Sequence, residues 1–346
     1  MTVHLVNLLE PWVLLRLVAG VVAAVLLGRA ALVALRVLLH FDLQSANEGQ
    51  LALERHVELS STFVRVGTVV QVLALVFTVL ASDRLSHGIR GAMCAYGVFH
   101  ANEWGFPALY ATFGVALFAG IVAQVYAFDR RLPRPDLVRP LSILTLALAP
   151  LATIDLGLTT RFLLELDLSV VASCCSVQLD RATAGNVTFA SGPRVASAIA
   201  AQVAVVLAAA AALWAARRPR APRVTLAGAL SIVAFPVAIA AVVLEVAPYA
   251  FELPDHICPF CLLHADVFGL GYFLFGAIFL ATTWGGGAAL VALLARRLPH
   301  VDAGIFEGFA RGRMRREAWA WGFALLCALA PIARYTWINQ GASLFP

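Results

Sequence analysis

The sequence contains no lysine and few charged residues of any kind. Charged residues make up 13% of its 346 residues and hydrophobic residues 61%, and the mean hydropathy is +0.86. A soluble domain carries roughly a quarter charged residues, so this composition excludes a water-soluble globular fold. The net charge of +5 comes from arginines in short segments between apolar runs, which argues against a nucleic-acid partner.

Apolar runs long enough to cross a bilayer, which takes about 20 residues each, recur along the chain. They fall at 11–38, 63–82, 108–128, 141–163, 195–216, 224–248, 262–294 and 318–338. The first run lacks a basic segment before it and a cleavage site after it, so we interpret it as a span and not a signal peptide. The sequence predicts an all-α polytopic membrane bundle of about eight helices. It forms a single transmembrane domain over residues 1–346, without a convincing internal repeat.

Two segments need a separate interpretation. The seventh run is too long for one span at 1.5 Å per residue, so we expect Gly285–Gly287 to break it or its end to project into the cytoplasm. Residues Ser45–Glu48 have the Ser-x-x-Glu form of a capping box. This pattern predicts a helix over 46–62, which we interpret as an extension of the second span.

Arginines are concentrated in alternate loops, which predicts the orientation. The arginine-rich loops contain Arg130, Arg131, Arg134 and Arg139; Arg217, Arg218, Arg220 and Arg223; and Arg296, Arg297, Arg311, Arg313, Arg315 and Arg316. Such loops stay in the cytoplasm. Both termini and the other loops are therefore expected outside, facing the periplasm from the lipid bilayer of a bacterial cytoplasmic (inner) membrane.

The cysteines are gathered on the predicted outer side. The outer loops contain Cys94, the doublet Cys174 and Cys175, and the pair Cys258 and Cys261. Thiols in an outer compartment can be oxidised and stay oxidised. Adjacent cysteines rarely bond each other, so the doublet is expected to serve two different partners, and one of them could pair with Cys94 as a structural or shuttle disulfide. The other could exchange with a disulfide between Cys258 and Cys261. Cys327 lies within a span and is expected to be a packed residue.

The sharpest motif is His-Ile-Cys-Pro-Phe-Cys-Leu-Leu-His over His256–His264. A Cys-x-x-Cys at a helix start places partial positive charge near the first thiol and stabilises its thiolate. Pro259 suits the first helical turn. The motif predicts a redox pair in which Cys258 is the nucleophile and Cys261 closes a reducible disulfide.

The flanking histidines favour a second interpretation, a metal site. Two thiolates with His256 and His264 would suit zinc, and soft thiolates also suit copper; a haem is a further cofactor of this kind. The spacing is tight for one helix, so such a site would take ligands from another loop, where Met93 and His100 are candidates. The aromatic residues of that loop, Tyr96, Trp104 and Phe106, are expected to anchor at the membrane interface.

Charged residues inside the predicted spans are a separate signal. They are Asp155, Arg161 and Glu165 in span four, Glu245 in span six and Asp266 in span seven. Charges at such depth are paired or line a wet cavity. Arg161 and Glu165 share a helical face and are expected to form an ion pair. A proton route or a polar pocket is the functional alternative.

The segment Cys-Pro-Phe-Cys-Leu-Leu at Cys258–Leu263 resembles the membrane thiol oxidoreductases of the vitamin K epoxide reductase and DsbB type. That resemblance implies a quinone-linked enzyme of four-helix type, with Cys258 and Cys261 as the redox pair beside the quinone. Cys94 and one of Cys174 or Cys175 would then be the shuttle cysteines.

Three functions follow from these patterns. The favoured one is a membrane thiol–disulfide oxidoreductase acting on the outer face, with a quinone as cofactor and a periplasmic thiol protein as partner. The second is a membrane protein that handles a metal or haem through cysteine, histidine and methionine. The third is a transporter, or a subunit of a larger membrane complex, whose outer loops are held by structural disulfides.

Overall fold

The computed structural model describes residues 9–40, 48–134, 136–169, 191–254, 256–297 and 302–345. Its regular elements over these ranges are helices, and eight of them are long and apolar enough to cross a membrane. The predicted fold class is thereby confirmed, and the protein is a polytopic helical membrane protein. The chain divides into two compact units, Met1–Ala172 and Ser173–Pro346. The single-domain interpretation and the orientation stay predictions.

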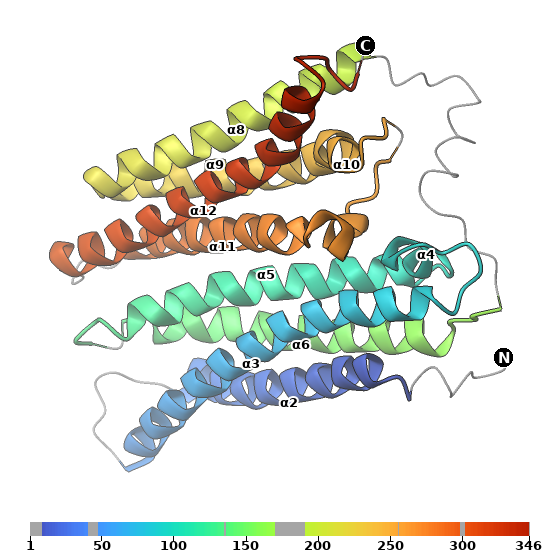
Figure 1. Ribbon diagram of the computed structural model, residues 1–346. Helices are drawn as coiled ribbons and strands as arrows, with labels where there is room; N and C mark the ends of the chain where they lie inside the picture. The colour runs from blue at the N-terminus through green and yellow to red at the C-terminus, as the bar shows by residue number, and fades with distance from the viewer. Residues whose placement is uncertain are drawn as a thin grey trace. The chain divides into compact units, whose positions relative to one another are not determined.

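The first unit is a four-helix bundle, coloured blue to green in Figure 1. Its long helices are α2 (Pro11–His40), α3 (Glu48–Ser86), α5 (Gly105–Asp129) and α6 (Val138–Leu164). Each packs against the next, and α6 packs back against α2, so the four close a ring in chain order. A short helix, α4 (Ala95–His100), lies in the connection between α3 and α5.

The second unit is also a four-helix bundle, coloured yellow to red in Figure 1. Its elements are α8 (Ser191–Arg217), α9 (Ala221–Ala241), the π-helical turn η1 (Val242–Val246), α10 (Ala247–Phe251), α11 (Leu270–Ala295) and α12 (Ala303–Ile338). The pairs α8–α9, α9–α11, α11–α12 and α12–α8 pack together and again close a ring in chain order. Two 3-10 turns, η2 (Phe260–Leu263) and η3 (Ala265–Val267), precede α11.

Side chains just outside two helices satisfy backbone donors at their first turns. The carboxylate of Glu10 accepts hydrogen bonds from the backbone N–H groups of Trp12 and Val13, at 2.7 and 3.1 Å. The Asp302 side chain accepts from the N–H of Gly304 at 2.9 Å. Because the first N–H groups of a helix have no partner within it, these acceptors fix where α2 and α12 begin.

The helix α11 differs from the predicted seventh span at its start, and not at its glycines. Gly285–Gly287 lie inside α11 and are buried, so the expectation that they break it is wrong. The run is shortened because Phe268 and Gly269 have φ values of 55° and 61°. Two successive left-handed residues cannot continue a right-handed helix, so α11 begins only at Leu270.

Glycines also bring α9 and α11 close together. A β-carbon on Gly228 would lie 2.3 Å from the carbonyl oxygen of Gly285 and 2.5 Å from the β-carbon of Ala289. Small residues permit such close approach between membrane helices, where packing and not water release drives association. Gly228 and Gly285 are therefore part of a helix–helix seam.

Two helices are longer than the spans predicted for them. The helix α3 runs unbroken from Glu48, so the 46–62 segment extends span two as interpreted, although Ser45–Asn47 lie outside the described residues. The helix α12 begins at Ala303, well before the predicted start at residue 318. At 1.5 Å per residue the two helices measure about 58 and 54 Å, against a hydrocarbon core of about 30 Å.

Candidate functional site

The Cys-Pro-Phe-Cys motif lies in the connection between α10 and α11 of the second unit. Cys258 precedes the turn η2, and Pro259 caps it with a φ of −68°. The N–H of His264 donates to the carbonyl oxygen of Cys261 at 3.1 Å and ends the turn. A rigid proline before a single tight turn therefore sets the separation of the two thiols.

The two sulfur atoms of the motif lie close together. The Sγ atoms of Cys258 and Cys261 are within 4.8 Å of each other, and the residues are 0% and 5% exposed. This proximity suits either a reversible disulfide or joint ligation of one metal ion. The structure thus places the predicted redox pair in a geometry that allows thiol chemistry.

The turn that carries the thiols is fixed against the core of the second unit. Leu262, between the second cysteine and Leu263, is fully buried in the apolar cluster that also contains Leu274 and Trp321. A β-carbon on Gly271 would lie 2.8 Å from a methyl of Leu263 and 3.0 Å from the carbonyl carbon of Leu262. The first turn of α11 therefore packs directly on η2.

The Cys-Pro-Phe-Cys motif does not lie at the start of a long helix. The motif was expected at the start of the seventh span, but α11 starts at Leu270, and η2 is a single turn of four residues. A helix dipole acts on groups within its first turn. Stabilisation of the Cys258 thiolate by the N-terminus of a long helix is therefore not part of this site.

The residues flanking the motif occupy different environments. The His256 ring packs on the Phe251 ring with centroids 4.2 Å apart. His264 has an extended backbone, and its carbonyl oxygen accepts from the N–H of Gly269 at 3.0 Å. Asp266 is exposed in η3, ahead of α11, and its interpretation as an intramembrane charge stays a prediction. The metal-ligand roles of the two histidines stay predictions.

The first unit presents its cysteine in the equivalent connection, between α3 and α5. Cys94 is buried and directly precedes α4. Met93 is 72% exposed and His100 is also exposed. The rings of Tyr96 and His100 stack with centroids 6.0 Å apart, and Phe106 meets Tyr96 edge-on at 5.3 Å. The aromatic residues of this loop therefore pack on one another, and their role as interface anchors stays a prediction.

The remaining cysteines are the doublet Cys174 and Cys175, and Cys327. Cys174 and Cys175 lie outside the described residues, so their roles as shuttle or structural thiols stay predictions. Cys327 lies on α12 and is part of the buried apolar cluster of the second unit, as expected for a packed residue.

A buried ion pair crosses the first unit between α2 and α6. The Nη2 atom of Arg16 lies 2.9 and 3.0 Å from the two carboxylate oxygens of Asp155, and the residues are 1% and 0% exposed. The same nitrogen donates to the hydroxyls of Thr112 at 3.0 Å and Thr159 at 2.9 Å. A charge buried this deeply needs such partners to offset its desolvation.

The network extends to α3, and its residues were only partly predicted. Gln71 donates to Asp155 at 2.8 Å, and Arg16 Nε donates to the hydroxyl of Thr78. A β-carbon on Gly20 would lie 2.7 Å from the guanidinium, so glycine leaves the room it occupies. Asp155 was predicted as an intramembrane charge, whereas Arg16 and Gln71 were missed. The signal for Arg16 was an arginine inside the first apolar run.

The charges at the end of α6 form the predicted pair. The Nε atom of Arg161 lies 2.9 Å from a carboxylate oxygen of Glu165, with side chains 53% and 31% exposed. The guanidinium also stacks over the Trp104 ring, 3.7 Å from its centroid. The ion-pair interpretation of Arg161 and Glu165 is therefore confirmed, and nothing about the pair requires a catalytic role.

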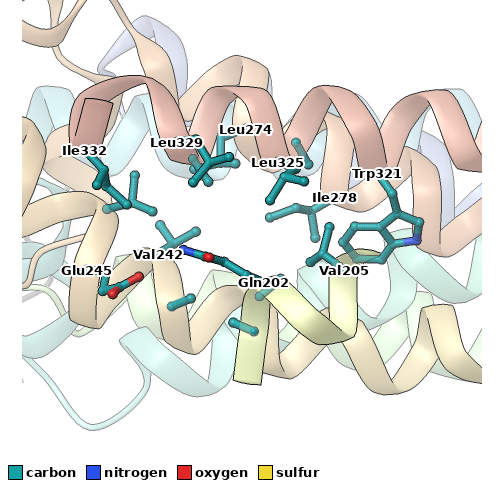
Figure 2. A pocket seen from close by; sticks show the side chains of 16 residues that line it. Gln202, Val205, Val242, Glu245, Leu274, Ile278, Trp321, Leu325, Leu329 and Ile332 are labelled. Atoms are coloured by element: carbon teal, nitrogen blue, oxygen red, sulfur yellow. The ribbon is translucent and has the colours of Figure 1, made fainter. Parts of the chain in front are cut away.

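A small apolar pocket, with a cavity volume of about 40 Å³, lies among the four helices of the second unit. Figure 2 shows Glu245 and Gln202 among apolar side chains, with the Trp321 ring at one end. Glu245 belongs to the π-helical turn η1, and Gln202 to α8. Glu245 thus lines a pocket that is apolar, and its interpretation as a charge lining a wet cavity stays a prediction.

A second buried carboxylate in this unit was not predicted. Glu317 of α12 is 0% exposed, and a β-carbon on Gly285 would lie 2.7 Å from its Oε1 atom. The Trp321 indole N–H, one turn further along α12, donates to the hydroxyl of Ser231 at 2.8 Å. Glu317 was missed because the eighth span was predicted to begin just after it.

Comparisons of the chain with models of protein families, with curated proteins and with solved structures find no match.

Proposed function

We propose that the protein is a membrane thiol–disulfide oxidoreductase that works through Cys258 and Cys261. The observation that carries this proposal is the proximity of their sulfur atoms, within 4.8 Å, on a tight turn packed against the core of one four-helix unit. A fixed dithiol of this kind can alternate between a disulfide and two thiols without rearranging the bundle.

The reaction transfers two electrons in each half. A thiolate of the substrate protein attacks the disulfide at Cys258 and releases the thiolate of Cys261. A second substrate thiol then displaces Cys258, which leaves a substrate disulfide and two reduced cysteines. A lipid-soluble quinone takes two electrons and two protons from these thiols and becomes a hydroquinone, which restores the disulfide.

The substrate side follows from the predicted orientation. With the arginine-rich loops in the cytoplasm, the motif faces the periplasm from a bacterial inner membrane, where a soluble thiol protein is the expected partner. The lipid bilayer supplies the quinone, so the protein would connect an aqueous substrate with a membrane-soluble acceptor.

Thiol trapping in intact membranes tests this proposal. Membranes held under oxidising or mildly reducing conditions are quenched with acid and treated with a mass-shifting maleimide. We expect the wild-type protein to gain two additions on mild reduction. Cys258→Ser and Cys261→Ser variants should lose that paired change, and Cys327→Ser, which alters a packed cysteine, should retain it. If the two sulfurs do not change state between these conditions, the proposal fails.

Metal analysis separates this function from the metal-handling alternative. A dithiol enzyme is expected to contain less than about one equivalent of zinc or copper after purification, with no dependence on Cys258. About one equivalent of bound metal that disappears in Cys258→Ser would assign the thiolates to a metal centre and overturn the redox role.

A further inference from the structure

The two units have the same number and ring order of long helices over the described residues. Each consists of four long helices that close a ring in chain order. In each, the connection between the second and third helix carries a cysteine followed by a short helical turn, which is α4 in the first unit and η2 in the second.

The two connections also match residue by residue. Residues 94–106 read CAYGVFHANEWGF, and residues 258–270 read CPFCLLHADVFGL. The cysteine, the histidine six places later, the alanine after it and the glycine before the last residue are identical. Six further positions pair chemically similar residues: tyrosine with phenylalanine, valine with leucine, phenylalanine with leucine twice, asparagine with aspartate, and tryptophan with phenylalanine.

The same register aligns the starts of the third helices. The matching glycines, Gly105 and Gly269, stand at the start of the third helix of their units. Among the nearest atoms that a β-carbon at these glycines would meet are the carbonyl oxygens of Phe99 and Leu263, which are matching residues in the alignment. The carbonyl oxygen of Phe99 is the nearest of these atoms at Gly105, whereas that of Leu263 is the third nearest at Gly269, at 3.9 Å. The two glycines also differ in backbone, because Gly269 has a φ of 61° and Gly105 has no positive φ.

We infer that the chain is a tandem duplication of one four-helix module, and that Cys94 and His100 hold the positions that Cys258 and His264 hold in the second copy. One difference between the copies bears on chemistry. Gly97 occupies the position of Cys261, so the first copy has one thiol in its turn where the second has two.

This assignment gives Cys94 a definite role, which rests on the proposed oxidoreductase function. Cys94 corresponds to the attacking thiol, and its own turn contains no second cysteine to resolve a mixed disulfide. Attack of its thiolate on a disulfide would form a mixed disulfide and release one thiolate. The thiol that then displaces it must come from outside the turn. The first copy is a one-thiol exchange site, and the second is a self-resolving two-thiol site.

Exchanging the two differing residues tests the correspondence. The double variant Gly97→Cys with Cys261→Gly keeps the number of cysteines and moves the Cys-x-x-Cys motif from the second copy to the first. Gly97 does not have a positive φ, so its backbone accepts a β-carbon. With oxidised glutathione, we expect a disulfide within the peptide Gly91–Arg130 and release of two reduced glutathione molecules. Mass spectrometry of the tryptic peptide after maleimide treatment reports it.

Matched variants decide the outcome. Ala101→Cys adds a thiol to the same peptide seven residues from Cys94, about 10 Å along a helix, which is too far for a disulfide. Its new thiol should take up maleimide in full. Cys261→Gly alone should fold, because glycine stands at that position in the first copy. If the thiol introduced at position 97 is alkylated as fully as the one at position 101, the correspondence is wrong.

This result is independent of the fate of the redox proposal. Wild-type Cys258 and Cys261 could fail to change oxidation state while the exchanged motif still forms its disulfide. That combination would reject the oxidoreductase and retain the duplication. An exchanged motif without a disulfide, in a protein whose wild-type pair does change state, would reject the duplication and retain the oxidoreductase.

Discussion

Replacing Asp155 tests whether the polar network of the first unit holds that bundle together. Asp155→Ala removes the acceptor of Arg16 and Gln71 and leaves a guanidinium that is 1% exposed without its counter-charge. Removing one partner of a buried ion pair costs about 3–5 kcal/mol. That range corresponds to a change of roughly 10² to 4 × 10³ in the unfolding equilibrium constant.

The double replacement separates the charge from the rest of the network. In Arg16→Met with Asp155→Leu, both charges are gone and apolar side chains of similar length fill the space. Replacing a buried pair in this way is neutral or stabilising by about 1–4 kcal/mol in soluble proteins. We therefore expect the double variant to recover most of the stability that Asp155→Ala loses.

Reversible unfolding in mixed micelles, titrated with a denaturing detergent and followed by circular dichroism, measures these free energies. Glu165→Ala is the matched control, because it breaks an ion pair on the same helix whose arginine is 53% exposed. An exposed pair contributes about 0–1 kcal/mol. The reasoning is refuted if Asp155→Ala destabilises no more than Glu165→Ala, or if the double variant is as unstable as the single one.

Two further predictions concern the second unit and use the same titration. Gly228→Ala would push a β-carbon to within 2.3 Å of the Gly285 carbonyl oxygen and should destabilise by about 1–3 kcal/mol. Gly276→Ala meets no atom within 4 Å and should be neutral or stabilising by up to about 1 kcal/mol; equal effects of the two changes would contradict the close seam. Ser231→Ala leaves the buried Trp321 indole N–H without its acceptor and should cost about 1–3 kcal/mol; an unchanged unfolding midpoint would show that another acceptor replaces the hydroxyl.

The number and type of the long helices could be predicted because long apolar runs are strong signals. The start of α11 could not, since it depends on left-handed backbone at Phe268, a residue type that rarely adopts it. The glycines of α11 were misread for a related reason. Glycine weakens an isolated helix, yet Gly285 lies in a seam where a neighbouring helix leaves no room for a side chain.

Contacts at the candidate sites could be predicted only between residues that lie a few positions apart in the sequence. Cys258 and Cys261 lie together because only two residues separate them in one turn, and Arg161 pairs with Glu165 one helical turn away. Arg16 and Asp155 are 139 residues apart in the chain, and hydrophobic periodicity does not say which helices will face each other. The repeat between the two connections could not be predicted from the Cys-Pro-Phe-Cys motif, because Gly97 stands in the first connection where Cys261 stands in the second.

The π-helical turn at Val242–Val246 contains one residue more than a regular α-helical path between α9 and α10 would need. A π turn holds one more residue than an α turn, so deleting one residue there would let α9 and α10 join as a continuous α-helix. Everything beyond the deletion would rotate by about 100° about the helix axis. Glu245 would change its place around the pocket, and the chain would enter the segment leading to Cys258 from a different face of the helix. The extra residue of the π turn thus sets the direction in which Glu245 points around the helix axis. It also sets the direction in which the chain leaves α10 toward Cys258.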